Sequence, residues 1–297
     1  MIQVHNAVIM AAGMSSRLAP ISYEKPKALL TIKGEILIER QIRQMQEAGI
    51  MDITVIVGYH KEQFAYLQKK FGVTLVENPC YKERNNHSSL YFVRDQLSDT
   101  YISCADFYFY QNPFRNRVEK PYYSTIYQAG NTNEWCVYTV QSGKIKEVLI
   151  GGADAWVMRG EAFFDKAFSE KLKPLLEYAF MDPASADTYW EDLYVKYIDE
   201  MELYERRDSD GNVMEFDSLE ELRKQAPEYE KASGCRIMER IAEELHCREG
   251  ELQDFQPVKR NGQIEGVNFS YGKNRYCYWY EARQIKELTD GCEAYEK

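Results

Sequence analysis

Small residues and fixed cations gather in one stretch near the start of the chain, between residues 7 and 34. An apolar run over 7–10 is typical of a buried parallel strand, and a turn made mostly of small and polar residues follows it. The turn consists of Ala11, Ala12, Gly13, Met14, Ser15 and Ser16. Backbone N–H groups in such a turn can approach an anion closely. Arg17 adds a forked cation, and Lys27 adds another beside Pro26, which keeps its neighbours in an extended loop. The stretch therefore predicts a polyphosphate site.

A carboxylate follows a second apolar run. Residues 101–105 predict a buried strand, and Asp106 comes directly after it. An Asp at the end of a strand in an α/β sheet points into the ligand crevice, where a hard oxygen can hold Mg²⁺ against phosphate oxygens. The alternative is an Asp that stabilises a turn. The phosphate-type turn upstream favours the metal interpretation.

Strands and helices alternate around these candidate residues. Apolar runs at 53–57 and 73–76 predict buried strands, and the stretches 41–49 and 61–71 predict helices. This rhythm predicts an α/β fold, a Rossmann-like doubly wound mixed sheet with its ligand at the carboxyl ends of the strands. From 121 to 159 shorter alternating runs predict antiparallel strands that cover the acceptor side of the site.

The predicted antiparallel strands are rich in aromatic residues. Trp135 stands beside Glu134, and Tyr122 beside Tyr123. Ring faces attract a desolvated cation by roughly 1–2 kcal/mol each, so such residues could form a cage around a quaternary ammonium group. The alternative is that they are core residues, as most aromatic side chains in strands are.

The composition limits the classes of partner. A formal charge of −10 over 297 residues argues against general nucleic-acid binding. The seven cysteines, Cys292 included, are scattered without a CxxC pair, which predicts neither a disulfide framework nor a zinc site and favours a reducing cytosol. No apolar run approaches the roughly 18 residues that span a bilayer, and no signal-like N-terminus is present. We expect a cytoplasmic protein with no membrane partner.

The N-terminal stretch resembles the signature of the sugar-1-phosphate and phosphocholine nucleotidyltransferases, which reads AAGxGxR, then PKxL, then a Gly before a helix. The matching residues are Ala11-Ala12-Gly13, Arg17, Pro26-Lys27-Ala28-Leu29 and Gly34. This sequence departs from the pattern at Ser15, where the family usually has a second Gly, so the loop must accommodate a Cβ. The resemblance runs from about residue 5 to about residue 230.

The resemblance implies a GT-A-like nucleotidyltransferase that uses Mg²⁺ to transfer CMP from CTP to phosphocholine. The turn backbone and Arg17 would hold the β and γ phosphates, and Lys27 would bridge the α phosphate and the acceptor. Asp106 matches the metal-binding Asp of the family. Asn86 and Ser88 would contact the cytosine or the ribose; the alternative is that one of them caps the helix.

Further acids are candidates for the metal. In the family an aromatic-Trp pair followed by an acid serves the metal and the choline head group, and Tyr189-Trp190-Glu191 matches it. Glu191 and Asp192 could also be an acidic first turn of a helix, and Asp217 a helix cap. The sequence leaves open which of these three acids joins Asp106.

The end of the chain differs from the rest. We expect a nucleotidyltransferase domain over 1–230 and a small α+β appendage over 231–297, with a helix at 237–245 and a hairpin at 255–280. The appendage faintly resembles the opening of a choline-kinase-like domain but is far too short for one, so we expect no kinase activity. A homodimer contact and a lid are the two roles that we consider for it.

Other functions stay open. Within the same reaction class the acceptor could be 2-aminoethylphosphonate or a sugar 1-phosphate. From another class, the chain could be a non-catalytic nucleotide-binding regulator, against which the intact cations and Asp106 argue. A GT-A glycosyltransferase would carry Asp-x-Asp, whereas residues 106–108 read Asp-Phe-Tyr.

Overall fold

The computed structural model describes residues 1–209, 211–260 and 263–288, and it divides the chain into two compact units. The large unit comprises Met1–Gly13 and Glu35–Met214. The small unit comprises Met14–Gly34 and the chain from Glu215 onward. The stretch with the predicted cations therefore shares a unit with the C-terminal segment, whereas the sequence analysis places the domain border at residue 230. Cys292 lies outside the described residues.

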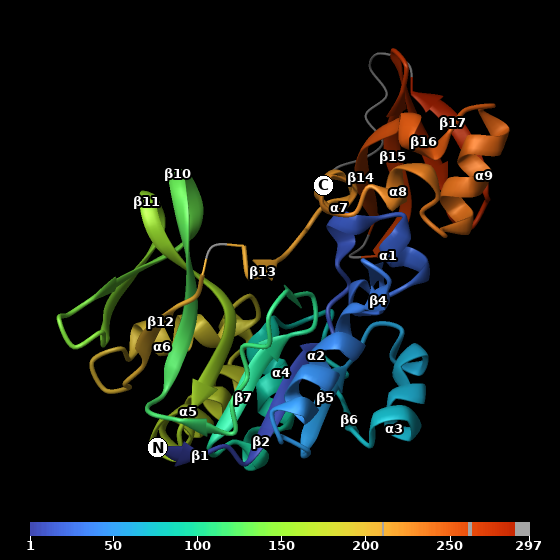
Figure 1. Cartoon of the computed structure of the whole chain (residues 1–297). Helices are drawn as coiled ribbons and strands as arrows, with labels where there is room; N and C mark the ends of the chain where they lie inside the picture. Colours follow the sequence, from blue (N-terminus) through green and yellow to red (C-terminus); the bar gives the residue numbers. More distant parts are fainter. Residues whose placement is uncertain (210, 261–262, 289–297) are drawn as a thin grey trace. The chain divides into compact units, whose positions relative to one another are not determined.

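A seven-stranded mixed sheet forms the centre of the large unit, in the order β12-β10-β11-β7-β2-β5-β6 (Figure 1). The strands are β2 (Asn6–Ala11), β5 (Ile53–Val57), β6 (Thr74–Glu77), β7 (Thr100–Cys104), β10 (Tyr122–Thr139), β11 (Ile145–Phe164) and β12 (Tyr204–Arg207). β2, β5, β6 and β7 run parallel, β11 is antiparallel to β7 and to β10, and β12 is parallel to β10. The buried β-branched run of β5 is typical of a strand covered on both faces.

Helices cover both faces of this sheet. They are α2 (Leu37–Glu47), α3 (Tyr66–Phe71), α4 (Asn86–Phe92), α5 (Lys166–Met181) and α6 (Trp190–Lys196), with 3₁₀ turns η3 (Lys61–Phe64), η4 (Arg94–Gln96) and η5 (Pro183–Ser185). Side chains alternate between the faces of a strand. Thus Ile102 of β7 packs in the cluster with α4, α5 and α6, while the Ser103 hydroxyl donates to Gln41 of α2 at 2.9 Å. The sheet is doubly wound, as the sequence predicts.

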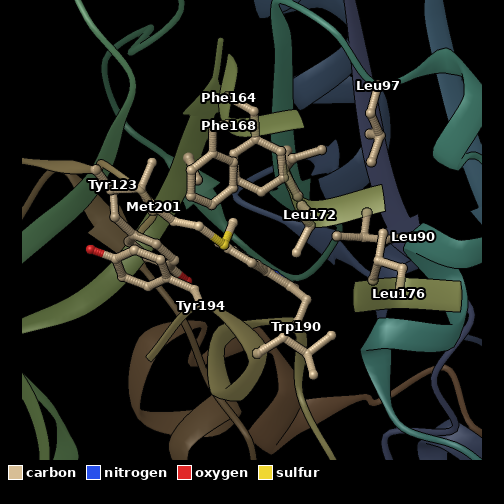
Figure 2. Close-up of a cluster of buried hydrophobic side chains, with 14 of the residues drawn as sticks. Leu90, Leu97, Tyr123, Phe164, Phe168, Leu172, Leu176, Trp190, Tyr194 and Met201 are labelled. Atoms are coloured by element: carbon tan, nitrogen blue, oxygen red, sulfur yellow. The ribbon is translucent and has the colours of Figure 1, made fainter. Parts of the chain in front are cut away.

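The main core of the large unit lies between the sheet and helices α4, α5 and α6. Figure 2 shows Phe164, Phe168, Leu172, Trp190 and Tyr194 gathered there. Short strands complete the unit: β1 (Ile2–Gln3) pairs with β9 (Arg117–Val118), and β8 (Tyr108–Phe109) pairs with β13 (Val213–Met214), while β4 (Glu35–Ile36) precedes α2.

The small unit combines the N-terminal stretch with a four-stranded antiparallel meander. The stretch contains η1 (Ser16–Leu18), α1 (Ile21–Glu24), η2 (Lys27–Leu29) and β3 (Thr31–Ile32). The C-terminal segment contains α7 (Leu219–Gln225), α8 (Glu228–Lys231), α9 (Arg236–Glu244), η6 (Glu249–Glu251), β14 (Leu252–Arg260), β15 (Gln263–Tyr271), β16 (Asn274–Trp279) and β17 (Gln284–Leu288). α9 buries Ile237, Met238, Ile241 and Ala242 on one face. The predicted hairpin is thus part of a larger sheet.

None of the helices in the described residues is long and apolar enough to cross a membrane.

Candidate active site

The turn after β2 lies at the point where the strand order reverses. β2 stands between β5 and β7, and the Ala105 N–H donates to the Met10 carbonyl at 3.0 Å, so the carboxyl ends of β2 and β7 are side by side. The Tyr59 N–H donates to the Ala12 carbonyl at 3.1 Å. A Cβ at Gly58 would stand 2.9 Å from that carbonyl oxygen, so a glycine is needed there. Reversal points of α/β sheets are where ligands bind.

Asp106 follows β7 at this edge of the sheet. It is half-buried and comes one residue after the amide that bonds to β2. Within the large unit the sequence-predicted carboxylate and the Ala11 to Gly13 part of the turn therefore share one edge. A carboxylate oxygen is the ligand type that Mg²⁺ prefers.

Ser15 has the backbone conformation for which the family's Gly is suited. Its φ of 47° and ψ of 46° lie in the left-handed region, and its carbonyl accepts from the Leu18 N–H at 2.9 Å to start η1. A side chain in this region costs about 1 kcal/mol or more relative to Gly. The loop keeps its fold with a serine at the expense of local strain.

One carboxylate holds both predicted cations in the small unit. Lys27 is 3% exposed, and its Nζ donates to Asp217 Oδ1 at 3.1 Å while standing 5.1 Å from the centre of the Phe216 ring. Arg17 Nη2 lies 3.0 Å from Asp217 Oδ2. A buried ammonium needs such a partner. The site thus presents two fixed cations, an arrangement that suits a phosphate-bearing ligand.

Asn86 links the starts of two helices. The Asn85 side chain accepts from the Asn86 N–H at 2.7 Å and caps α4. The Asn86 Oδ1 accepts from the Trp190 N–H at 2.8 Å at the start of α6, and its Nδ2 donates to Glu191 Oε2 at 3.0 Å. Ser88 is buried, and its hydroxyl donates to the Asn85 carbonyl at 2.7 Å. Both residues proposed for base contacts therefore have defined roles in local structure.

Glu191 lies at the centre of a small polar network. Besides the Asn86 bond, its Oε1 accepts from the Tyr123 hydroxyl at 3.2 Å, and the Tyr123 ring stacks on Trp190 with centroids 5.7 Å apart. Burial raises the pKa of Glu191 to about 7, although the bonds from Asn86 and Tyr123 lower it. Its charge therefore changes near neutral pH.

Two residues predicted for the acceptor head group pack against each other at the surface. The rings of Trp135 and Tyr189 meet edge to face with centroids 6.3 Å apart, and Tyr189 is 45% exposed. Glu134 forms an ion pair with Arg159 at 3.3 Å. Aromatic faces beside acidic groups are the chemistry that binds a quaternary ammonium.

Trp190 and Tyr122, which are also predicted for the acceptor, lie in the interior. Trp190 is 1% exposed and packs edge to face on Phe164. The Tyr122 hydroxyl donates to the buried Glu161 at 3.0 Å, and Arg206 contacts both. Burial raises the pKa of Tyr122 well above its usual range. Both rings are therefore packed in the interior of the large unit.

Asp192 has a structural role at the start of α6. Its Oδ2 accepts from the Tyr189 N–H at 2.7 Å and so caps the helix. Phe216 and Arg206 are participants that the sequence analysis did not single out. Phe216 stands between two acids, a pattern that could have indicated it, whereas no local pattern joins Arg206 to Glu161, 45 residues away.

Known proteins resemble this chain over most of its length. The sequence pattern of the MobA-like NTP transferase domain matches residues 7–155. A choline-phosphate cytidylyltransferase of Streptococcus pneumoniae is 36% identical over 218 residues, which cover 73% of this chain and 95% of the relative. A 2-aminoethylphosphonate cytidylyltransferase of Lancefieldella rimae is 34% identical over 221 residues, which cover 73% of this chain and 90% of that relative. The solved structure of the CTP:phosphocholine cytidylyltransferase from Streptococcus pneumoniae superposes on this structure with a TM-score of 0.72. The superposition covers 75% of this chain and 97% of the solved chain.

Proposed function

Because the chain belongs to the cytidylyltransferases with a MobA-like NTP transferase domain, we propose that it transfers CMP from CTP to phosphocholine and releases pyrophosphate. The observation that carries this proposal is the 36% identity to a choline-phosphate cytidylyltransferase over 95% of that relative. The pair of cations on Asp217 and the pair of rings at Trp135 and Tyr189 support it.

The reaction requires no general base. A phosphate oxygen of phosphocholine, already ionised at neutral pH, attacks the α phosphorus of CTP. The new P–O bond forms as the bond to the β-phosphate oxygen breaks, and pyrophosphate leaves with that electron pair. The work of the protein is to align the reactants and to neutralise charge.

The cations of the small unit carry the charge neutralisation. We assign the β and γ phosphates to Arg17 and to the backbone of residues 11–16, and the α phosphate and acceptor oxygens to Lys27. The burial of Lys27 supports this assignment, since a buried ammonium acts in a lower dielectric and attracts a phosphate more strongly. On this assignment the incoming phosphate replaces Asp217 as the partner of Lys27.

The donor set fits a magnesium ion. Asp106, half-buried at the end of β7, offers the hard oxygen that Mg²⁺ requires, and bound Mg²⁺ would offset negative charge at the reacting phosphate. Among the other acids, Glu191 is held by Asn86 and Tyr123, and Asp192 caps α6. We keep Asp217, whose carboxylate pairs with Arg17 and Lys27, as the candidate for the second ligand.

The acceptor head group is assigned to the surface at the start of α6. The rings of Trp135 and Tyr189 would face the trimethylammonium group, and Glu191 and Glu134 would supply negative charge. Asn86 and Ser88 are kept for the cytosine or the ribose, and Tyr122 and Trp190 stay proposed for the acceptor. A primary ammonium, as in 2-aminoethylphosphonate, needs three hydrogen-bond acceptors in place of ring faces. Because one relative is a 2-aminoethylphosphonate cytidylyltransferase, we keep 2-aminoethylphosphonate as the second candidate acceptor.

The test is pyrophosphate release with CTP and Mg²⁺ and, in parallel, phosphocholine, 2-aminoethylphosphonate or glucose 1-phosphate. We expect release with phosphocholine, and a loss of at least a hundredfold in Asp106→Ala and in Lys27→Ala, each with an unchanged circular-dichroism spectrum. Near-normal turnover in Lys27→Ala would refute its assigned role. Preferred release with 2-aminoethylphosphonate would move the assignment to the second candidate. CTP binding without release on any acceptor would favour a regulator.

A further inference from the structure

The stretch with Arg17 and Lys27 is built into one unit with a C-terminal segment that continues beyond the resemblance to the family. We propose that this segment, from Glu215 onward, positions both cations for the reaction, and that Tyr280 and Tyr229 are positioning residues. This inference rests on the proposed function.

The first anchor holds α1. The ring of Tyr23 stacks on that of Tyr280, which follows β16, with centroids 3.9 Å apart and planes 30° apart. Tyr280 is buried, whereas Tyr23 is 40% exposed. On the next residue, Glu24 Oε2 accepts from the Arg236 N–H at 2.9 Å, at the first residue of α9. A carboxylate at a helix N-terminus is stabilised by the unpaired amides there. α1 is therefore tied to two elements of the C-terminal segment.

The second anchor holds the other end of the stretch. The Tyr229 hydroxyl of α8 donates to the Thr31 carbonyl at 3.1 Å. Burial raises the pKa of Tyr229 to about 12, so the hydroxyl stays a donor at neutral pH. Lys27 lies between the two anchors in the sequence, so both ends of its loop are fixed to the same body.

The third connection leads to Lys27 directly. Asp217, its ion partner, precedes α7, whose cap Ser218 accepts from the Glu221 N–H at 3.2 Å. The buried guanidinium of Arg223 on α7 donates to the carbonyls of Leu252 at 2.6 Å and Glu249 at 2.7 Å. Through these contacts the meander holds α7, and α7 holds the carboxylate that orients Lys27.

This arrangement matters because nucleotidyl transfer depends on alignment. A displacement of a catalytic group by about 1 Å can cost about a hundredfold in rate. If the C-terminal segment fixes Lys27, then loosening an anchor lowers kcat and speeds backbone exchange in residues 14–34, while the large unit and the KM for phosphocholine stay nearly unchanged.

The test uses the full chain, four single variants and the double variant of Tyr23→Ala with Tyr280→Ala. Tyr280→Ala removes the buried ring of the first anchor, Tyr23→Ala removes its half-exposed partner, and Tyr280→Phe restores the ring without the hydroxyl. Tyr276→Ala is the matched control. It removes a ring of β16 that stacks on Phe269 and not on Tyr23. The measurements are kcat and KM for pyrophosphate release, and hydrogen exchange of the amides in 14–34.

We expect Tyr280→Ala and Tyr23→Ala each to lower kcat about tenfold, with the double variant no worse than either, since both remove one interaction. Tyr280→Phe should restore kcat, and Tyr276→Ala should leave it and the exchange of 14–34 unchanged. Equal losses in Tyr276→Ala, or normal kcat and exchange in both anchor variants, would overturn the proposal. If the wild-type chain releases no pyrophosphate, the proposed function fails, and the exchange of 14–34 alone decides whether the segment anchors this stretch.

Discussion

Glu191 is a buried acid whose charge changes near neutral pH. Its pKa is raised to about 7 by burial, so the carboxyl is largely neutral at pH 6 and largely ionised at pH 8. If it faces the trimethylammonium group, ionisation strengthens binding. We predict that the KM for phosphocholine falls about fivefold as the pH rises through 7, equivalent to about 1 kcal/mol. Steady-state kinetics from pH 6 to pH 8.5 measure this change.

Two variants separate this effect from ionisation of the acceptor itself. Glu191→Gln should keep the high KM of low pH across the whole range. Because the phosphate of the acceptor titrates identically in the assays of both proteins, a difference between their profiles reports on Glu191. Asn86→Asp keeps the oxygen that accepts from the Trp190 N–H but replaces a donor with a like charge, which raises the pKa of Glu191 and moves the midpoint to higher pH. Parallel profiles for the wild type and Glu191→Gln would exclude Glu191 from acceptor binding.

Ser15 gives a second prediction at the scale of a residue. In the left-handed region a Gly avoids the strain of a Cβ, but it also increases the entropy of the unfolded chain. We predict that Ser15→Gly raises the free energy of unfolding by about 0.5 kcal/mol and does not raise the KM for CTP. Ser16→Gly, one residue on and inside η1, should instead destabilise by about 0.5–1 kcal/mol. Urea unfolding of Ser15→Gly and Ser16→Gly measures both changes. An equal loss of unfolding free energy in the two variants would contradict the strain at Ser15.

At the scale of an element, β12 is attached to the sheet by a buried charge network. Glu161 is fully buried, and Arg206 contacts both it and the Tyr122 hydroxyl. Removing Arg206 leaves the carboxyl without its cation, so we predict that Arg206→Ala lowers the free energy of unfolding by about 3–5 kcal/mol. Arg207→Ala, on the next and exposed residue of the same strand, should cost less than about 1 kcal/mol. Urea denaturation of both variants measures the difference, and similar losses would refute the network.

The elements show how far the sequence leads. Contiguous apolar runs identify β2, β5 and β7, because a buried parallel strand needs no alternation. The positions of the turn at 11–16 and of Asp106 follow from where those runs end. Tyr122 and Tyr123 show the limit. Neighbouring residues of a strand face opposite sides, so one ring meets Glu161 and the other meets Glu191. Only the pairing of β10 with distant strands decides which of the two rings faces Glu161 and which faces Glu191. No local sequence pattern contains that pairing.

At the scale of the whole molecule, ligand binding should stabilise the unit that carries the cations. Residues 14–34 interrupt the large unit in the sequence and belong to the same unit as the C-terminal meander, about 200 residues later in the chain. A ligand that binds only the folded state stabilises it by about 2.7 kcal/mol at a hundred times its Kd. If Arg17 and Lys27 hold CTP, as we propose, bound CTP stabilises the small unit.

We predict that saturating CTP slows hydrogen exchange in β14, β15 and β16 about a hundredfold for amides that exchange through unfolding of this unit, and that Lys27→Ala loses most of this protection. Lys224→Ala, which removes an equal charge from an exposed position of α7, should keep it. Hydrogen exchange monitored by mass spectrometry, with and without CTP, measures this protection in the wild type and in each variant. Protection confined to the large unit would place the nucleotide phosphates away from Arg17 and Lys27. Protection of the meander lost only in Lys27→Ala would identify the C-terminal segment as part of the body that holds the nucleotide.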